Sequence, residues 1–192
     1  VISFILQNNG RVTDHYYGQE IYMLRIKALG SLVDQLLENG SIREIDLPPE
    51  PQFEIGEFHH TTLDNFPNPV EPPDQNSPGI CVIDSGIATG HPFLQPAIGD
   101  AQSFPPSLGT ELDEHNHGTM VSGLALYGDV NACIENLNFS PKMFLYSGKV
   151  TNAQNRFDDE NLIINQMQTT IRYFFDNYHC RVYNISLADP DL

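Results

Sequence analysis

Short apolar runs recur in the second half of the chain and predict β-strands. The first is Gly79–Ile83, which leads directly into Asp84. Lys142–Val150 is the second run and Arg181–Ser186 the third. Their length and their content of β-branched and aromatic residues favour strands over helices.

Segments with helical features separate these runs. His117–Tyr127 is rich in small residues and predicts a helix in which Gly118 and Gly123 allow close packing. A longer amphipathic helix is expected to begin at Asp158 or Asp159. Its apolar residues lie three or four positions apart, which is the helical period: Ile163, Met167, Ile171, Phe174 and Tyr178. Strands separated by helices predict an α/β fold with a parallel sheet and flanking helices.

A second pattern, strand–helix–strand, covers Glu20–Leu47. Glu20–Lys27 has the composition of a strand, with a helix as the alternative. Ser31 is placed to cap a short helix, and Gly40 to end it. Ile42–Leu47 then predicts a further strand, closed by two prolines.

A segment rich in proline and acidic residues, 48–78, lies between the two patterns. Successive prolines fix φ and remove backbone donors, so we predict an extended linker. It would separate a small α/β segment, residues 1–47, from residues 79–192. Its adjacent histidines, His59 and His60, are interpreted as surface residues, because neighbouring side chains of an extended chain do not converge on one metal.

The charge of the chain is strongly acidic, and it argues against one class of partner. There are 25 acidic and 9 basic residues, giving a formal net charge of −16. Such a surface repels phosphate backbones, so nucleic acid is not expected as a partner. The charge favours solubility, or basic substrates.

The cysteines and the apolar stretches bear on the compartment in which the protein is found. The count of three cysteines, without a CxxC pair, does not predict a disulfide framework or a zinc finger. Cys81 and Cys180 are interpreted as small buried hydrophobes. This usage slightly favours a reducing compartment such as the cytoplasm. No run approaches the roughly 18 apolar residues of a membrane span, and the first residues lack the features of a signal peptide.

Two residues combine into a candidate catalytic pair. Asp84 alone could be a turn residue, and His117 alone could be structural. They lie 33 positions apart, one at the end of a predicted strand and the other at the start of a predicted helix. A doubly wound fold can bring both to the carboxyl edge of the sheet. In a serine hydrolase such a carboxylate orients the imidazole that takes the proton of the nucleophile.

Three motifs extend this pair into a family resemblance. Val82–Ile87, followed by the dipeptide His91-Pro, resembles the aspartate motif of subtilisin-like serine peptidases. His115–Ala125, with the sequence HNHGTMVSGLA, resembles their histidine motif. Val182–Leu187 resembles the strand with which that family holds an extended substrate. The resemblance covers about residues 79–192.

The resemblance implies the N-terminal part of a subtilisin-like catalytic domain, with an incomplete α/β fold. Asp84 would orient the imidazole, and His117 would act as general base and then as general acid. Residues 1–47 would be either a pro-segment or an unrelated accessory subdomain. The substrate would be a peptide or protein.

Substrate contacts follow from the same resemblance. Backbone groups of three consecutive residues would pair with the extended substrate: Ser186, Leu187 and Ala188. Phe157 lies where family members shape a distal substrate pocket, although packing in the core is an equal alternative.

Departures from the family limit what this chain can do. Its two Gly-Thr pairs, at Gly109 and Gly118, are not followed by serine, so the motif of the nucleophile is absent. No counterpart of the oxyanion-hole asparagine is found. Phe93 stands where many family members have an acidic calcium ligand. No cofactor is therefore expected, and calcium, the one candidate that the resemblance offers, is doubtful. The serine is therefore expected after Leu192, in a remaining C-terminal part that this chain needs as its partner.

Two alternatives come from other classes of function. A metal-dependent hydrolase could use Asp84, Glu114, His115 and His117, although the chain has no HExxH motif. A subtilisin-like domain without its serine could bind peptides or partners and cut nothing.

Overall fold

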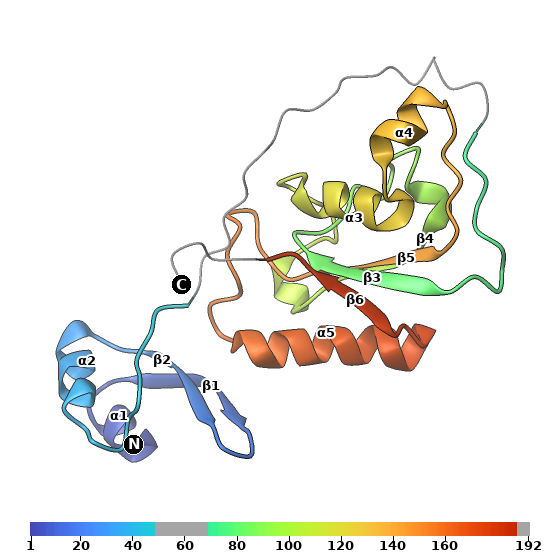
Figure 1. The fold of residues 1–192 in the computed structure, drawn as a ribbon. Helices are drawn as coiled ribbons and strands as arrows, with labels where there is room; N and C mark the ends of the chain where they lie inside the picture. The colour runs from blue at the N-terminus through green and yellow to red at the C-terminus, as the bar shows by residue number, and fades with distance from the viewer. Residues whose placement is uncertain (49–68, 188–192) are drawn as a thin grey trace.

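A parallel sheet organises the larger part of the molecule, as the computed structural model shows (Figure 1). The structure describes residues 1–48 and 69–187. The strand order is β4-β5-β3-β6, and all three pairings are parallel. The four strands have these bounds: β3 Gly79–Asp84, β4 Ile98–Ser103, β5 Phe144–Lys149 and β6 Val182–Ile185. The mixed α/β architecture predicted from the sequence is therefore confirmed.

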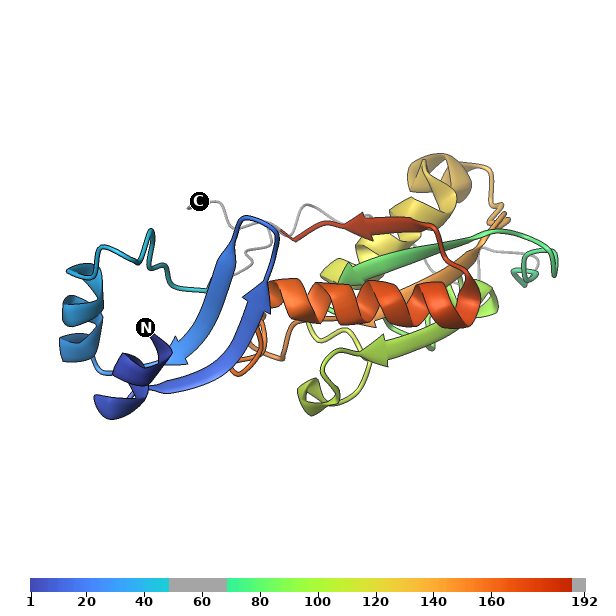
Figure 2. The same ribbon diagram turned by 90° about the horizontal axis from the view of Figure 1, so that it is seen from below.

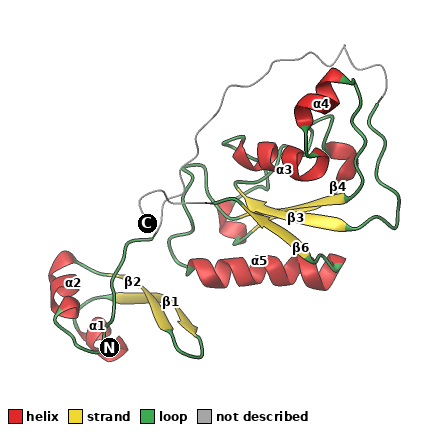
Figure 3. Ribbon diagram, in the orientation of Figure 1, coloured by secondary structure: helices red, strands yellow, loops and turns green. Residues whose placement is uncertain are grey.

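Helices cover both faces of this sheet, which makes three layers (Figures 1 and 3). One face carries α3, His117–Tyr127, and α4, Val130–Glu135. The other face carries α5, Ile163–Tyr178. Two short 3-10 helices, η2 Gln95–Ala97 and η3 Pro106–Leu108, flank strand β4.

Strand β3 is buried on both sides, which explains its unbroken apolar sequence. Val82 points to the α3 layer, where it packs in one core with Leu126. Cys81 and Ile83 point to the α5 layer and pack with Phe174. Alternate residues of a strand face opposite sides, so a strand between two helical layers buries apolar side chains on both of its faces.

The first residues form a separate small unit with a core of its own. It consists of α1 Ile2–Gln7, β1 Arg11–Tyr17, β2 Tyr22–Lys27 and α2 Gly30–Leu37. The two strands are antiparallel. Both lie beside the first turn of α5 (Figure 2), where Asp14 and Arg11 bond to Leu162 and Glu160.

Several predictions about the N-terminal part were wrong. The strand expected at Ile42–Leu47 is irregular chain, although Ile42 and Ile45 do pack on the small core. Helix α2 begins at Gly30, and no side chain caps it, so Ser31 is not its cap. Helix α1 and strand β1 were not predicted.

The start of the long helix also differs from the prediction. Helix α5 begins at Ile163, not at Asp158 or Asp159. The carboxylate of Asp158 accepts hydrogen bonds from the backbone N–H groups of Glu160 and Asn161, each at 3.0 Å. These bonds stabilise a turn before the helix, a common alternative for aspartate.

Other predictions fall partly outside the described residues. His59, His60 and most of the predicted linker lie there. The three-part division of the chain therefore stays a prediction. All three cysteines are free, and Cys81 and Cys180 are buried as expected. In the described part of the chain, no helix has the length and apolar character to span a bilayer.

Candidate active site

Asp84 and His117 meet at the carboxyl edge of the sheet. Asp84 is the last residue of β3 and is 1% exposed, and His117 is the first residue of α3. The imidazole Nδ1 lies 2.8 Å from the carboxylate Oδ1 of Asp84. The side chain of His117 is 17% exposed, so the ring connects the buried carboxylate to the surface.

The carboxylate of Asp84 is held by two groups and shielded from solvent. Besides the imidazole, the backbone N–H of Ser85 donates to its Oδ1 at 2.7 Å. Its Oδ2 is buried and has no hydrogen-bonding partner among the described residues. Burial raises the pKa of Asp84, although the hydrogen bonds from His117 and Ser85 oppose this effect. The imidazole and Ser85 thus both favour the charged form of Asp84 against burial, which suits a carboxylate that stabilises an imidazolium.

Two glycines permit the approach of helix α3 to the end of β3. A Cβ atom on Gly118 would collide with the carbonyl oxygen of Gly86. Gly86 itself has φ +110°, and a Cβ atom there would collide with the carbonyl oxygen of Glu111. The glycine after the histidine is therefore a steric requirement of bringing His117 to Asp84.

Lys149 carries a buried charge beside Asp84 and was not predicted from the sequence as a residue of the site. It is paired with Asp84 in the register of β5 and β3 and is 1% exposed. Its Nζ donates to the carbonyl oxygen of Leu112 and to Oε2 of Glu114, both at 2.8 Å. Its position near the end of a predicted strand is the sequence feature that could have pointed to it. Lys149 thus ties the segment before His117 to the sheet.

These contacts bear on the alternative of a metal site. The carboxylate of Glu114 pairs with Lys149, and that of Asp84 pairs with His117. Across residues 1–48 and 69–187 there is no group of three or more histidine, cysteine, aspartate or glutamate side chains that could hold a metal ion. The metal-dependent hydrolase has no support in this arrangement.

The predicted substrate strand forms an edge of the sheet. Among the described strands, β6 pairs with β3 alone. Ser186 follows β6, is exposed, and donates through its hydroxyl to Oδ1 of Asn184 at 2.7 Å. Leu187 packs partly on the core beneath the sheet, and Ala188 lies outside the described residues. Backbone pairing with a substrate stays a prediction for all three positions.

Phe157 is placed away from solvent. Its side chain is 7% exposed and belongs to the same core as Val150 and Phe174. Of the two alternatives for Phe157, this placement favours core packing over a substrate pocket.

Phe93, at the position where family members have a calcium ligand, lies among other aromatic residues. The ring of Phe93 stacks on Phe139, with centroids 4.3 Å apart. A phenyl ring supplies none of the oxygen ligands that calcium requires. The residue present therefore does not fit a calcium ligand.

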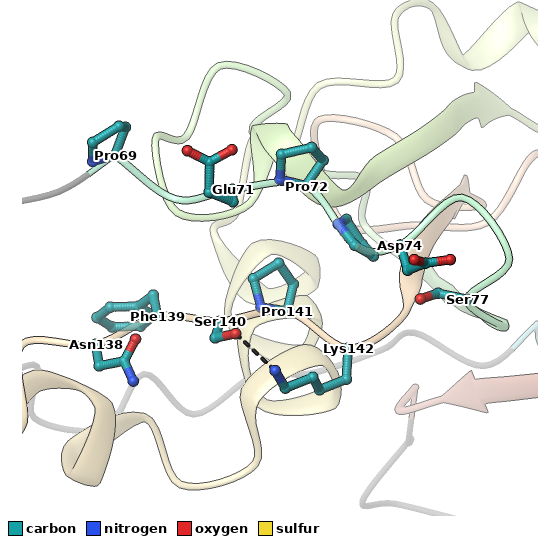
Figure 4. A pocket seen from close by; sticks show the side chains of 11 residues that line it. Pro69, Glu71, Pro72, Asp74, Ser77, Asn138, Phe139, Ser140, Pro141 and Lys142 are labelled. Carbon is teal, nitrogen blue, oxygen red and sulfur yellow. Dashed lines mark hydrogen bonds between the residues drawn. The ribbon is translucent and has the colours of Figure 1, made fainter.

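A surface hollow lies at the other end of the sheet (Figure 4). Pro72, Asp74 and Ser77 line it, and Phe139 and Lys142 face them from the chain before β5. These residues precede β3 and β5, whereas Asp84 is at the end of β3. The hollow is therefore separate from the catalytic pair.

Comparison with known families divides the chain in two. The model of the subtilase family matches residues 75–191, which include both Asp84 and His117. Residues 1–47 are similar to the model described as the Y4kK central domain. No curated protein matches the chain.

Proposed function

Because the chain belongs to the subtilase family of peptidases, we propose that the complete protein is a serine endopeptidase with an Asp-His-Ser triad. Asp84 and His117 supply the first two members, and a serine after Leu192 supplies the third. The observation that carries this proposal is the 2.8 Å contact between the imidazole Nδ1 of His117 and the buried carboxylate of Asp84.

The reaction is acyl transfer in two steps. The serine oxygen attacks the carbonyl carbon of the peptide while His117 takes the hydroxyl proton. The imidazolium then gives this proton to the departing amine, which leaves an acyl-enzyme. Water attacks the acyl-enzyme in the same way and releases the acid. Throughout, Asp84 keeps the Nδ1 proton in place and stabilises the positive ring.

Substrate binding is proposed at the edge of the sheet. An extended peptide would add beside β6, using backbone groups at Ser186, Leu187 and Ala188. The open edge of β6 supports this placement. Nucleic acid and membrane are not proposed as partners, since the net charge is −16 and no apolar span is found in the sequence.

Fluorophosphonate labelling of the complete protein tests the triad. Mass spectrometry of the labelled peptide should place the probe on a serine after Leu192, and His117→Ala should abolish labelling. The chain Val1–Leu192 is the matched control and should not react, because its sequence lacks the Gly-Thr-Ser motif. A folded complete protein, freed of any pro-segment, that takes no probe would instead be a peptide-binding domain without catalysis.

A further inference from the structure

The helix that carries the site's histidine lacks an ordinary cap. Its N-cap residue, Asn116, is left-handed with φ +64°, and its side chain makes no capping hydrogen bond. The first N–H groups of a helix have no partner within the helix. In α3 two of them, from Gly118 and Thr119, donate to Ser85 and Asp113 at 3.0 and 2.7 Å. The first turn is therefore fixed by residues outside the helix.

The carboxylate of Asp113 is the centre of this arrangement. One oxygen accepts from the hydroxyl of Ser85 at 2.8 Å and from the N–H of His115 at 3.0 Å. The other oxygen accepts from both the N–H and the hydroxyl of Thr119, each at 2.7 Å. Ser85 directly follows Asp84. A single carboxylate thus joins the loop after β3 to the first turn of α3.

A second hydrogen bond joins the same two segments. The hydroxyl of Thr119 accepts from the backbone N–H of Ala88 at 3.0 Å, which ties the same loop to the same turn. A negative charge at the start of a helix is also favourable for the helix dipole. Asp84 and His117 thus stand on the two segments that Asp113 joins.

We propose that Asp113 is a positioning residue of the active site: it holds the first turn of α3 on the loop after β3 and so sets the contact between His117 and Asp84. This inference rests on the proposed function. Asp113 acts through Ser85 and Thr119, not on the substrate.

Replacement by asparagine tests this role with little change of volume. Asp113→Asn puts an amide donor where one oxygen now accepts two hydrogen bonds. Glu111→Gln is the matched control, because it makes the same charge change in the same segment. Glu111 contributes its backbone oxygen, which accepts from Ile87.

The readout is the ring of His117 in the whole chain labelled with ¹⁵N-histidine. The Nδ1 proton that is donated to Asp84 should give a low-field signal, assigned by its loss in His117→Ala. We expect Asp113→Asn to broaden or displace this signal. Glu111→Gln should leave it unchanged. An unchanged signal in folded Asp113→Asn overturns the proposal.

A second pair of variants keeps the test decisive if Asp113→Asn does not fold. Ser85→Ala removes the hydrogen bonds of the Ser85 hydroxyl to Asp113 and Gly118 and leaves the bonds between Asp113 and Thr119, so it should displace the same signal. Thr119→Ser keeps the hydroxyl and should not displace it. An unaffected signal in Ser85→Ala overturns the proposal.

Kinetics of the complete protein separate this inference from the proposed function. With active sites counted by fluorophosphonate, Asp113→Asn should lower kcat about 10²-fold, as a small misplacement of catalytic groups does, and change KM less than about twofold. An unchanged kcat per active site contradicts the positioning role. A complete protein that shows the expected change in the His117 signal but never cuts peptides would refute only the proposed function.

Discussion

Asp14 on β1 accepts a 2.7 Å hydrogen bond from the backbone N–H of Leu162, which is 148 positions later and immediately precedes α5. The same oxygen accepts from the side-chain amide of Asn165 at 2.9 Å. Asp14 therefore caps the long helix from the small N-terminal unit. Glu160 adds ion pairs to Arg11 at 2.7 Å and to Lys27 at 2.5 Å.

Loss of this cap should weaken the fold. Asp14→Ala leaves the N–H of Leu162 without its acceptor and should lower the free energy of unfolding by about 1 kcal/mol, as the loss of a helix cap does. Urea unfolding of the whole chain measures the change. Asp34→Ala, at an exposed position of α2, is the control and should stay within about 0.5 kcal/mol of the parent. Equal effects of the two substitutions would contradict a capping role for Asp14.

The same cap should depend on pH. Burial acts to raise the pKa of Asp14, but hydrogen bonds from Asn165, Leu162 and His15 outweigh it and lower the pKa. A carboxyl whose pKa is lowered on folding stabilises the protein above its ordinary pKa, and this contribution is lost as the pH falls through the folded value. The difference in stability between the parent and Asp14→Ala should be full at neutral pH and shrink below about pH 4. A constant difference between neutral and acid solution would argue against the lowered pKa.

Two glycines of one helix should respond in opposite ways to alanine. Gly118→Ala forces a methyl group into the backbone at Gly86, where no flexible side chain can yield. We expect a loss of more than about 3 kcal/mol or failure to fold. Gly123→Ala meets nothing within 4 Å and should stabilise the chain by up to about 1 kcal/mol. Thermal unfolding compares the two, and equal tolerance of alanine at both positions would disprove the close approach of α3.

Removal of Glu114 should lower the stability of the protein more than removal of Lys149. Glu114→Ala leaves a buried ammonium without its carboxylate and should lower stability by about 2 kcal/mol, less than for a fully buried pair because the side chain of Glu114 is 47% exposed. Lys149→Met removes the charge and keeps the volume, so it should cost less than about 1 kcal/mol. Denaturant unfolding of both variants gives the order. The reverse order would mean that the hydrogen bond to Leu112, not the charge pair, dominates.

Asp84→Asn should separate catalysis from folding. In the complete protein, turnover should fall about four orders of magnitude, because an amide favours the wrong tautomer of His117, as in a serine protease of another fold. The thermal midpoint should change little, since the size of the side chain is conserved. Peptide cleavage assays and calorimetry test the two expectations. Nearly normal turnover would remove Asp84 from the mechanism.

Local sequence was sufficient for much of the catalytic part. The bounds of helix α3 were predicted as the structure has them, and β3 and β5 differ from their predicted runs by a few residues. A strand buried on both faces is a short continuous apolar run, so its length and composition reveal it. Asp84 and His117 were proposed from the motifs that contain them, and the structure places their side chains 2.8 Å apart.

Tertiary structure alone decided the rest. Ile42–Leu47 has the composition of a strand, but a strand needs a neighbour to satisfy its backbone groups, and none pairs with it in the described structure. Asp113 is bonded to Ser85 across 28 positions, and Asp14 to Leu162 across 148. A hydrogen bond between distant segments produces no periodic pattern in the sequence. Its partners are determined by where the packed elements end, not by the residues next to them in the chain.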